Sequence, residues 1–249
     1  MQFINLQFTS SDEVDVLKTT ISKPKEDVLN NLQEVMENIE VGKNYEIKGE
    51  DFEMKIRPVN TEVKGNETYV DFVACEEILR KKNNIPDSEI LTIMQIEIES
   101  KNNKSLVNQV EYAIYNSKKE RMDLSDCNDV TIKINYEIRD PSILDSSIIS
   151  SFSKDGIDVL NIKDSFFTDI CYPYSDNNSD ITLEDRIKDI YQNYSLCEDG
   201  CEYEQLYINM NSIVCNCEVK KNISLEESSS NLGDMVKFAL QSSTFLVIK

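Results

Sequence analysis

Apolar and polar residues alternate with a period of two along much of the chain, which predicts a protein rich in short β-strands. The apolar run from Ile90 to Ile98 is short and rich in isoleucine, so we expect it to form a buried central strand. Residues 110–115 and 121–124 flank a polar turn and predict a hairpin. The expected strands lie at residues 1–20, 45–47, 52–56, 68–72, 90–98, 110–115 and 130–138.

Helical spacing of apolar residues replaces this alternation in a few places. Residues 24–39 predict an amphipathic helix, which begins near a capping Ser22 and carries Pro24 in its first turn. A shorter helix is expected from Cys75 to Lys82. Residues 183–191 predict another helix, with Asp180 or Thr182 as its cap.

Many strands at short spacing, with few helices and no βαβ rhythm, predict a mainly β fold of α+β character. We expect an antiparallel β-sandwich with one or two packed helices, followed by a small disulfide-rich C-terminal module. The expected divisions are a sandwich over residues 1–140, a connector over 141–163, a cysteine-rich module over 164–220 and a Ser-rich segment with a terminal strand over 221–249.

The chain carries 46 acidic and 26 basic residues, for a formal net charge of −20. A charge of this sign repels both the phosphate backbone of nucleic acids and an anionic membrane surface. We therefore exclude nucleic acid as a partner, and expect contact with a membrane only through a segment outside this chain.

The sequence contains no histidine, the side chain that most often serves as a general base near neutral pH. Ser151-Phe-Ser-Lys154 and Ser175-Asp-Asn177 match two motifs of penicillin-interacting enzymes, but the third motif of that set does not follow them. We predict no catalytic residues and interpret the chain as a non-enzyme. A hydrolase that uses a pair of carboxylates on glycans stays open as an alternative.

Seven cysteines occur, and five of them fall between residues 171 and 217. Cys197 and Cys201 form one close pair and Cys215 and Cys217 another, so bridges that cross between the pairs are expected. By elimination Cys75 is expected to bond to Cys127, and Cys171 is the expected unpaired cysteine. The five-cysteine segment resembles the latter half of an epidermal-growth-factor-like module that lacks one of the usual six cysteines.

A thiolate metal site is the competing interpretation of these cysteines, but neither a C-x2-C spacing nor a histidine supports it. Residues 176–185 are rich in carboxylate and amide oxygens, which suit Ca²⁺. Ile181 and Ile187 replace the glycine and glutamate that the helix–loop–helix calcium motif requires, so a solvated loop is the preferred interpretation. We predict no metal and no cofactor.

Asparagine-linked glycosylation is predicted by N-x-S/T sequons, all of which fall in segments expected to be loops, turns or module surface. The sequons begin at Asn66, Asn103, Asn177, Asn193 and Asn222.

The first eighteen residues have no basic leader and no continuous apolar stretch, so they predict no secretory signal. No segment reaches the roughly 18 apolar residues of a membrane span. The cysteines and sequons nevertheless favour the extracellular face of the plasma membrane. We therefore expect an ectodomain fragment whose two ends, including its signal and its anchor, are missing.

The run from Ile157 to Ser175, together with Tyr191-Gln-Asn-Tyr-Ser-Leu-Cys197-Glu-Asp-Gly-Cys201, resembles a segment of large uncharacterised surface proteins of ciliates and other AT-rich protists. Cys75-Glu-Glu-Ile-Leu-Arg80 and Leu124-Ser-Asp-Cys127 resemble the preceding part of the same proteins. The resemblance covers about residues 40–220 and implies a membrane-anchored, cysteine-rich ectodomain. It implies no catalytic or ligand-binding residues.

These observations predict a non-catalytic extracellular structural or recognition module of a cell-surface glycoprotein. Its expected partner is an extracellular protein or a glycan that the sequence does not identify. A cytosolic acidic scaffold is the second alternative, beside the carboxylate hydrolase.

Overall fold

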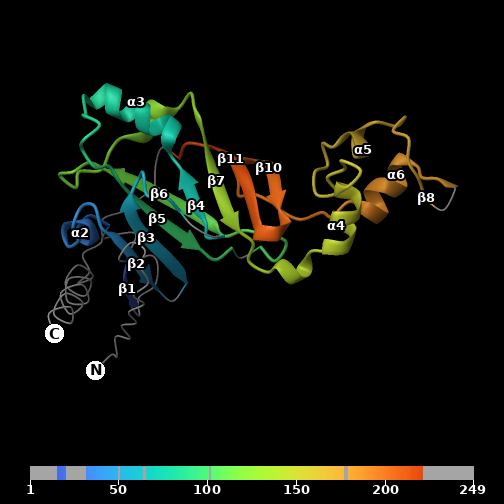
Figure 1. Cartoon of the computed structure of the whole chain (residues 1–249), viewed down its shortest axis with the longest axis horizontal. Helices are drawn as coiled ribbons and strands as arrows, with labels where there is room; N and C mark the ends of the chain where they lie inside the picture. The colour runs from blue at the N-terminus through green and yellow to red at the C-terminus, as the bar shows by residue number, and fades with distance from the viewer. Residues whose placement is uncertain are drawn as a thin grey trace.

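The computed structural model describes residues 16–20, 32–49, 51–63, 66–100, 102–176 and 179–220. Two β-sheets pack against each other, and short helices gather at one end beyond β10 and β11 (Figure 1). Neighbouring strands are antiparallel except for the parallel pair β1 and β2. The first sheet has the order β1-β2-β3-β5-β6, with bounds Val16–Thr20, Asn44–Lys48, Phe52–Pro58, Thr92–Ile98 and Gln109–Tyr115.

The second sheet is smaller and entirely antiparallel. Its four strands come from distant parts of the chain, because β11 returns to pair with β7 along its whole length. A separate two-stranded ribbon joins β8 (Ser175–Asp176) to β9 (Ser179–Asp180). The second sheet has the order β10-β11-β7-β4, with bounds Cys201–Tyr207, Ser212–Glu218, Thr131–Glu137 and Tyr69–Asp71.

One face of the first sheet is covered by α2 (Leu32–Glu37). Val35 and Met36 of this helix are fully buried against alternate residues of β3, such as Met54 and Ile56. The predicted helix over 24–39 is confirmed over residues 32–37, and its first part lies outside the described residues.

The other face of the first sheet meets the second sheet in the larger core. Tyr112 and Tyr136 lie in this core, and alternation along β7 buries Ile132, Ile134 and Tyr136 while Lys133 is exposed. Gln95 is 1 % exposed and connects the sheets, because its amide oxygen accepts from Val70 N at 3.3 Å and its Nε2 donates to the Thr68 carbonyl at 2.9 Å.

Helical segments occupy the connections. Among the described residues the longest helix is α3 (Val73–Asn83), which packs on the 3-10 turn η1 (Leu124–Cys127). Asp145 begins α4 by accepting hydrogen bonds from Ser147 N and Ile148 N, and the predicted cap Thr182 begins α6. The remaining segments are η2 (Pro141–Ile143), α4 (Ser146–Ser153), α5 (Ser165–Thr168), α6 (Leu183–Asp185), the π-turn η3 (Arg186–Ile190) and η4 (Ile208–Met210).

Arg186 connects the helical segments that lie beyond β10 and β11, called here the helical end of the molecule. This residue is only 3 % exposed, and its guanidinium donates to the carbonyls of Phe166, Asp169 and Tyr172 at 2.7 to 3.3 Å. The guanidinium carbon also lies 5.2 Å from the ring centroid of Phe166 and 5.8 Å from that of Tyr172. These contacts join α5 and the segment after it to η3.

The predicted mainly β, α+β fold is confirmed, as are the buried strand at Thr92–Ile98 and the strand at Thr131–Glu137. The predicted C-terminal disulfide cluster is present as well, and its strands β10 and β11 extend the second sheet because β11 pairs with β7. One detail differs. The predicted hairpin is reduced to one bridge between Tyr115 and Arg121, supported by hydrogen bonds from Met122 N to the Ile114 carbonyl and from Asn116 N to the Glu120 carbonyl.

Candidate functional site

Three disulfide bonds form. The sequence predicted the bond between Cys75 and Cys127, and it predicted that the two close pairs are bridged to each other without specifying the partners. Cys75 of α3 is bonded to Cys127 of η1. The two close pairs are cross-bridged, as Cys197–Cys215 and Cys201–Cys217, because the C-x-C pair on β11 directs both sulfurs toward the preceding segment and β10. Cys171 is free and exposed. The bridges of the C-terminal cysteines therefore attach this region to the second sheet through β11.

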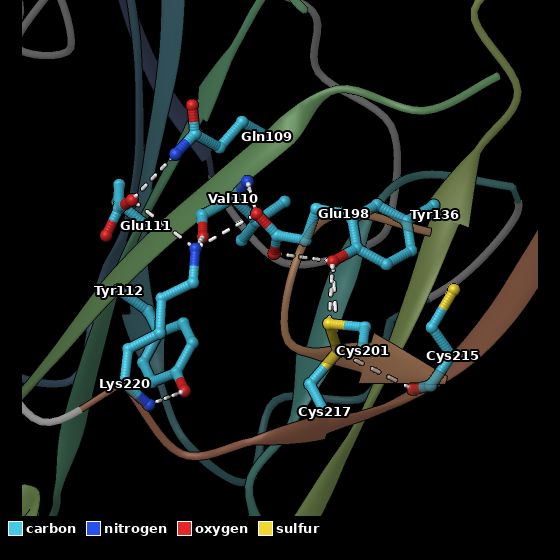
Figure 2. A network of polar contacts seen from close by, with 10 residues as sticks. All are labelled: Gln109, Val110, Glu111, Tyr112, Tyr136, Glu198, Cys201, Cys215, Cys217 and Lys220. Carbon is cyan, nitrogen blue, oxygen red and sulfur yellow. Dashed lines mark hydrogen bonds and ion pairs between the residues drawn. A yellow bond between two sulfur atoms is a disulfide. The ribbon is translucent and has the colours of Figure 1, made fainter. Parts of the chain in front are cut away.

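Glu198 lies between the two bridged cysteines of the 197–201 loop and forms the centre of a polar network (Figure 2). Its side chain is 9 % exposed. One carboxylate oxygen accepts from the Tyr136 hydroxyl at 2.6 Å, and the other accepts from Val110 N at 3.3 Å and from Lys220 Nζ at 3.0 Å. One carboxylate thus connects the second sheet, the outer edge of the first sheet and the end of β11.

Lys220 completes this network just beyond β11. Its Nζ donates to the Val110 carbonyl at 2.5 Å and lies 3.3 Å from Glu111 Oε1, while its backbone N donates to the Tyr112 hydroxyl at 2.9 Å. Gln109 Nε2 also donates to Glu111 Oε1, at 3.2 Å. The ammonium group therefore has one carbonyl and two carboxylates as partners, which restricts its movement.

A pocket of about 340 Å³ opens beside this network. Most of its lining side chains are polar, and they supply both hydrogen-bond donors and acceptors. Three carboxylates and one ammonium group give the lining a net negative charge. The lining residues are Ser100, Asn102, Ser105, Val107, Gln109, Glu111, Ser195, Cys197, Glu198, Asp199 and Lys220.

The two tyrosines of the network are held in the neutral form. Burial, and then the charge and hydrogen bond of Glu198, raise the pKa of Tyr136 far above its ordinary value. Burial likewise raises the pKa of Tyr112. The Tyr136 hydroxyl lies 3.8 Å from Cys201 Sγ and 3.9 Å from Cys217 Sγ, so it packs on the disulfide while it donates to Glu198. This arrangement fixes the position of the Glu198 carboxylate.

A second polar cluster surrounds Lys55 on β3. Its Nζ lies 2.9 Å from Glu67, 3.5 Å from Glu97 and 3.6 Å from Glu53. Glu53 and Glu97 face each other directly on neighbouring strands, where like charges repel unless a cation lies between them. Burial raises the pKa of Glu97. Burial alone would lower the pKa of Lys55, but the Glu67 hydrogen bond and the three carboxylates outweigh it and raise the pKa.

Glu53 and Glu97 also line a second pocket, of about 380 Å³. Lys48, Arg139 and Glu99 contribute further charges to it, and Arg139 pairs with Glu99 at 3.0 Å. The two facing carboxylates, Glu53 and Glu97, are therefore accessible to solvent through this pocket.

The sequon asparagines 66, 103 and 193 are exposed and lie outside regular secondary structure, as predicted. Asn177 and Asn222 lie outside the described residues, as does the terminal strand expected near residue 240. Within the described part of the chain, no group of three or more His, Cys, Asp and Glu side chains is placed to hold a metal ion.

Sequence reasoning did not find Glu198, Lys220, Glu97 or Lys55. The local sequence does not distinguish Lys220, Glu97 or Lys55 among 72 charged residues, since most of their partners lie far away along the chain. The one available signal was the position of Glu198 between two cysteines, because a loop closed by two bridges fixes whatever side chain it carries.

Comparisons with known proteins give no family for this chain. No family model matches it, and neither the curated proteins nor the solved structures provide a match. Among the helices of the described residues, none is long and apolar enough to cross a membrane.

Proposed function

We propose that this chain is a non-catalytic extracellular recognition module of a cell-surface glycoprotein. The observation that carries the proposal is the set of three disulfide bonds. Disulfides persist in oxidising compartments and are rare in the cytosol. They count against the alternative of a cytosolic acidic scaffold.

The positions of the bridges add to this argument. One connects α3 to η1, and two connect the 197–201 region to β11 inside the second sheet. The Cys197–Cys215 bridge holds a loop against the second sheet, and the other two bridges join a helix to a turn and β10 to β11. Such crosslinks are expected of a module that must keep its surface loops in place outside the cell. The exposed asparagines of three sequons and the resemblance to protist surface proteins point in the same direction.

The first test is peptide mapping by mass spectrometry under non-reducing conditions, on protein from its native cell. We expect the peptides of Cys75 and Cys127 to be joined, and glycans on exposed sequons. Seven free thiols together with bare asparagines would refute the proposal.

The pocket beside Glu198 is the proposed recognition surface. Its lining offers donors and acceptors side by side, which matches the hydroxyl groups of a neutral glycan better than an anionic ligand. An array of immobilised neutral oligosaccharides would test this. We expect Glu111→Gln to weaken any binding, because Glu111 lines the pocket, whereas Glu77→Gln on the exposed face of α3 changes the same charge and should leave binding intact.

A carboxylate hydrolase is the second candidate, and the facing pair Glu53 and Glu97 favours it. The raised pKa of Glu97 suits a general acid, and Glu53 would act as the partner carboxylate. Release of reducing ends from a panel of polysaccharides tests this activity. It should be abolished by Glu97→Gln and by Glu53→Gln, and unaffected by Glu77→Gln; a panel without any product would remove the candidate.

A further inference from the structure

Each of the three described sequons has an exposed asparagine and a hydroxyl that forms a hydrogen bond within the fold. Thr68 is 2 % exposed, and its Oγ1 accepts from Glu137 N at 3.1 Å. Ser105 is 9 % exposed and donates from Oγ to the Val107 carbonyl at 2.8 Å. Ser195 donates from Oγ to the Cys197 carbonyl at 3.2 Å. The sequon requires this hydroxyl two residues after the asparagine. In the folded chain the hydroxyl is already engaged in an internal hydrogen bond, so the glycosylating enzyme cannot bind it.

The backbone around Ser195 is fixed as well. Ser195 N donates to the Lys104 carbonyl at 3.0 Å, and its own carbonyl accepts from Leu106 N at 2.9 Å. These bonds form a parallel bridge between Ser105 and Ser195. The two sequons, ninety residues apart in the sequence, therefore run side by side in the same direction, and neither can adopt a new backbone conformation without breaking the bridge.

One disulfide closes this arrangement. Cys197 supplies the carbonyl that accepts the Ser195 hydroxyl, and its sulfur is bonded to Cys215 in the interior of the second sheet. Cys215 is fully buried, so closure of this bridge anchors Cys197 and, through it, the hydroxyl of the Asn193 sequon.

We propose that glycosylation of Asn193 competes with closure of the Cys197–Cys215 disulfide, and that Asn193 accepts an oligosaccharide only before this bridge forms. This inference rests on the proposed passage of the chain through a secretory compartment. There a disulfide oxidant takes two electrons and two protons from the Cys197 and Cys215 thiols as the bridge closes, and is itself reduced to a dithiol. The donor is an oligosaccharide linked to a lipid pyrophosphate. The Asn193 amide nitrogen forms a bond to the anomeric carbon, the bond from that carbon to the pyrophosphate oxygen breaks, the lipid pyrophosphate leaves, and the amide proton passes to a base of the transferase.

The test uses unglycosylated chain with its three bridges intact, incubated with a purified oligosaccharyltransferase and its lipid-linked donor. Occupancy at Asn193 and Asn66 is measured by mass spectrometry before and after reduction and alkylation of the cysteines. We expect the oxidised chain to remain bare at Asn193 and the reduced chain to become modified there. Modification of Asn193 in the oxidised wild-type chain would overturn the proposal.

Two matched variants assign the effect to one bridge. Cys197→Ser/Cys215→Ser opens the proposed block, while Cys75→Ser/Cys127→Ser removes a different bridge. Asn66 reports general unfolding, because Thr68 is held by β7 and not by Cys197. A rise in Asn193 occupancy without a rise at Asn66, in the first variant only, supports the assignment; equal rises at both sites, or no rise at Asn193, overturn it.

This outcome is independent of the proposed cellular location. Native protein with free thiols and bare asparagines would refute the extracellular function, whatever the purified chain accepts. Native protein with intact bridges would leave that function standing even if oxidised Asn193 proved to be an acceptor.

Discussion

Replacing Arg186 with methionine should destabilise the helical end of the molecule far more than the loss of one surface charge would. Methionine keeps most of the aliphatic stem, so the change removes chiefly the polar contacts of the guanidinium. Three carbonyls, those of Phe166, Asp169 and Tyr172, lose a charged donor. The structure therefore isolates a polar effect at a buried position.

The expected magnitude follows from these contacts. A hydrogen bond to a charged group contributes about 1.5–3 kcal/mol, and a desolvated cation–π contact adds about 1–2 kcal/mol. Because such contributions are not additive, we expect a loss of about 3–5 kcal/mol. Arg186→Lys should recover only part of it, since an ammonium group cannot reproduce the planar fork that reaches three carbonyls.

Urea unfolding followed by tyrosine fluorescence measures this loss, since the chain has eleven tyrosines and no tryptophan. Lys188→Met is the matched control, because Lys188 is an exposed cation in the same π-turn and its removal should change stability by less than about 0.5 kcal/mol. Hydrogen exchange should increase over residues 146–191 only in the Arg186 variants. Equal unfolding free energies for Arg186→Met and Lys188→Met would refute the reasoning.

Three further perturbations test other parts of the fold. Above pH 10.0, the pKa of a tyrosine in the unfolded chain, the free energy of unfolding should fall as pH rises. Burial raises the pKa of Tyr112 and Tyr136 in the folded chain, so the unfolded chain loses these protons first. Tyrosinate absorbance that appears at a higher pH in the folded than in the unfolded chain would verify it. Cys75→Ser/Cys127→Ser should lower the unfolding free energy by about 4 kcal/mol, and an unchanged urea midpoint would contradict the structure. Asn84→Ala should cost about 1 kcal/mol and Asn84→Gly much less, since Asn84 ends α3 with φ of 53°; thermal unfolding separates the two.

Local patterns in the sequence were sufficient to predict several elements. Alternation identified β7, because one face of that strand is buried and the other solvated. The cross-bridging of the two close cysteine pairs followed from the strain of a C-x-C ring, and the structure has it. These features depend on chemistry within a few residues, which a single sequence contains.

 Long-range pairing could not be predicted in this way. β11 returns to pair with β7, and its Val214 pairs with Asn135, 79 positions earlier in the sequence (214 minus 135), so no local pattern encodes this contact. β7 ends at Glu137, whereas β11 begins only at Ser212. The contacts of Glu198 with Tyr136 and Lys220 follow from this pairing, so the candidate site became visible only once the fold was known.

Gln95 shows the same limit at a single residue. Within the apolar run of β5 a glutamine suggests an exposed position, yet it is buried because its amide group satisfies Val70 N and the Thr68 carbonyl of the opposite sheet. Its burial depends on a partner 25 residues away, which the period of the strand does not reveal.

The contacts of Val110 have a consequence for aggregation. β6 is the last strand of its sheet, and the outward N–H and C=O groups of such a strand can template the addition of a strand from another molecule. At Val110 both groups are already occupied, the N–H by Glu198 and the C=O by Lys220. An ion pair thus replaces the neighbouring strand at this point, and a second chain would have to displace two charged side chains before it could add to the sheet there.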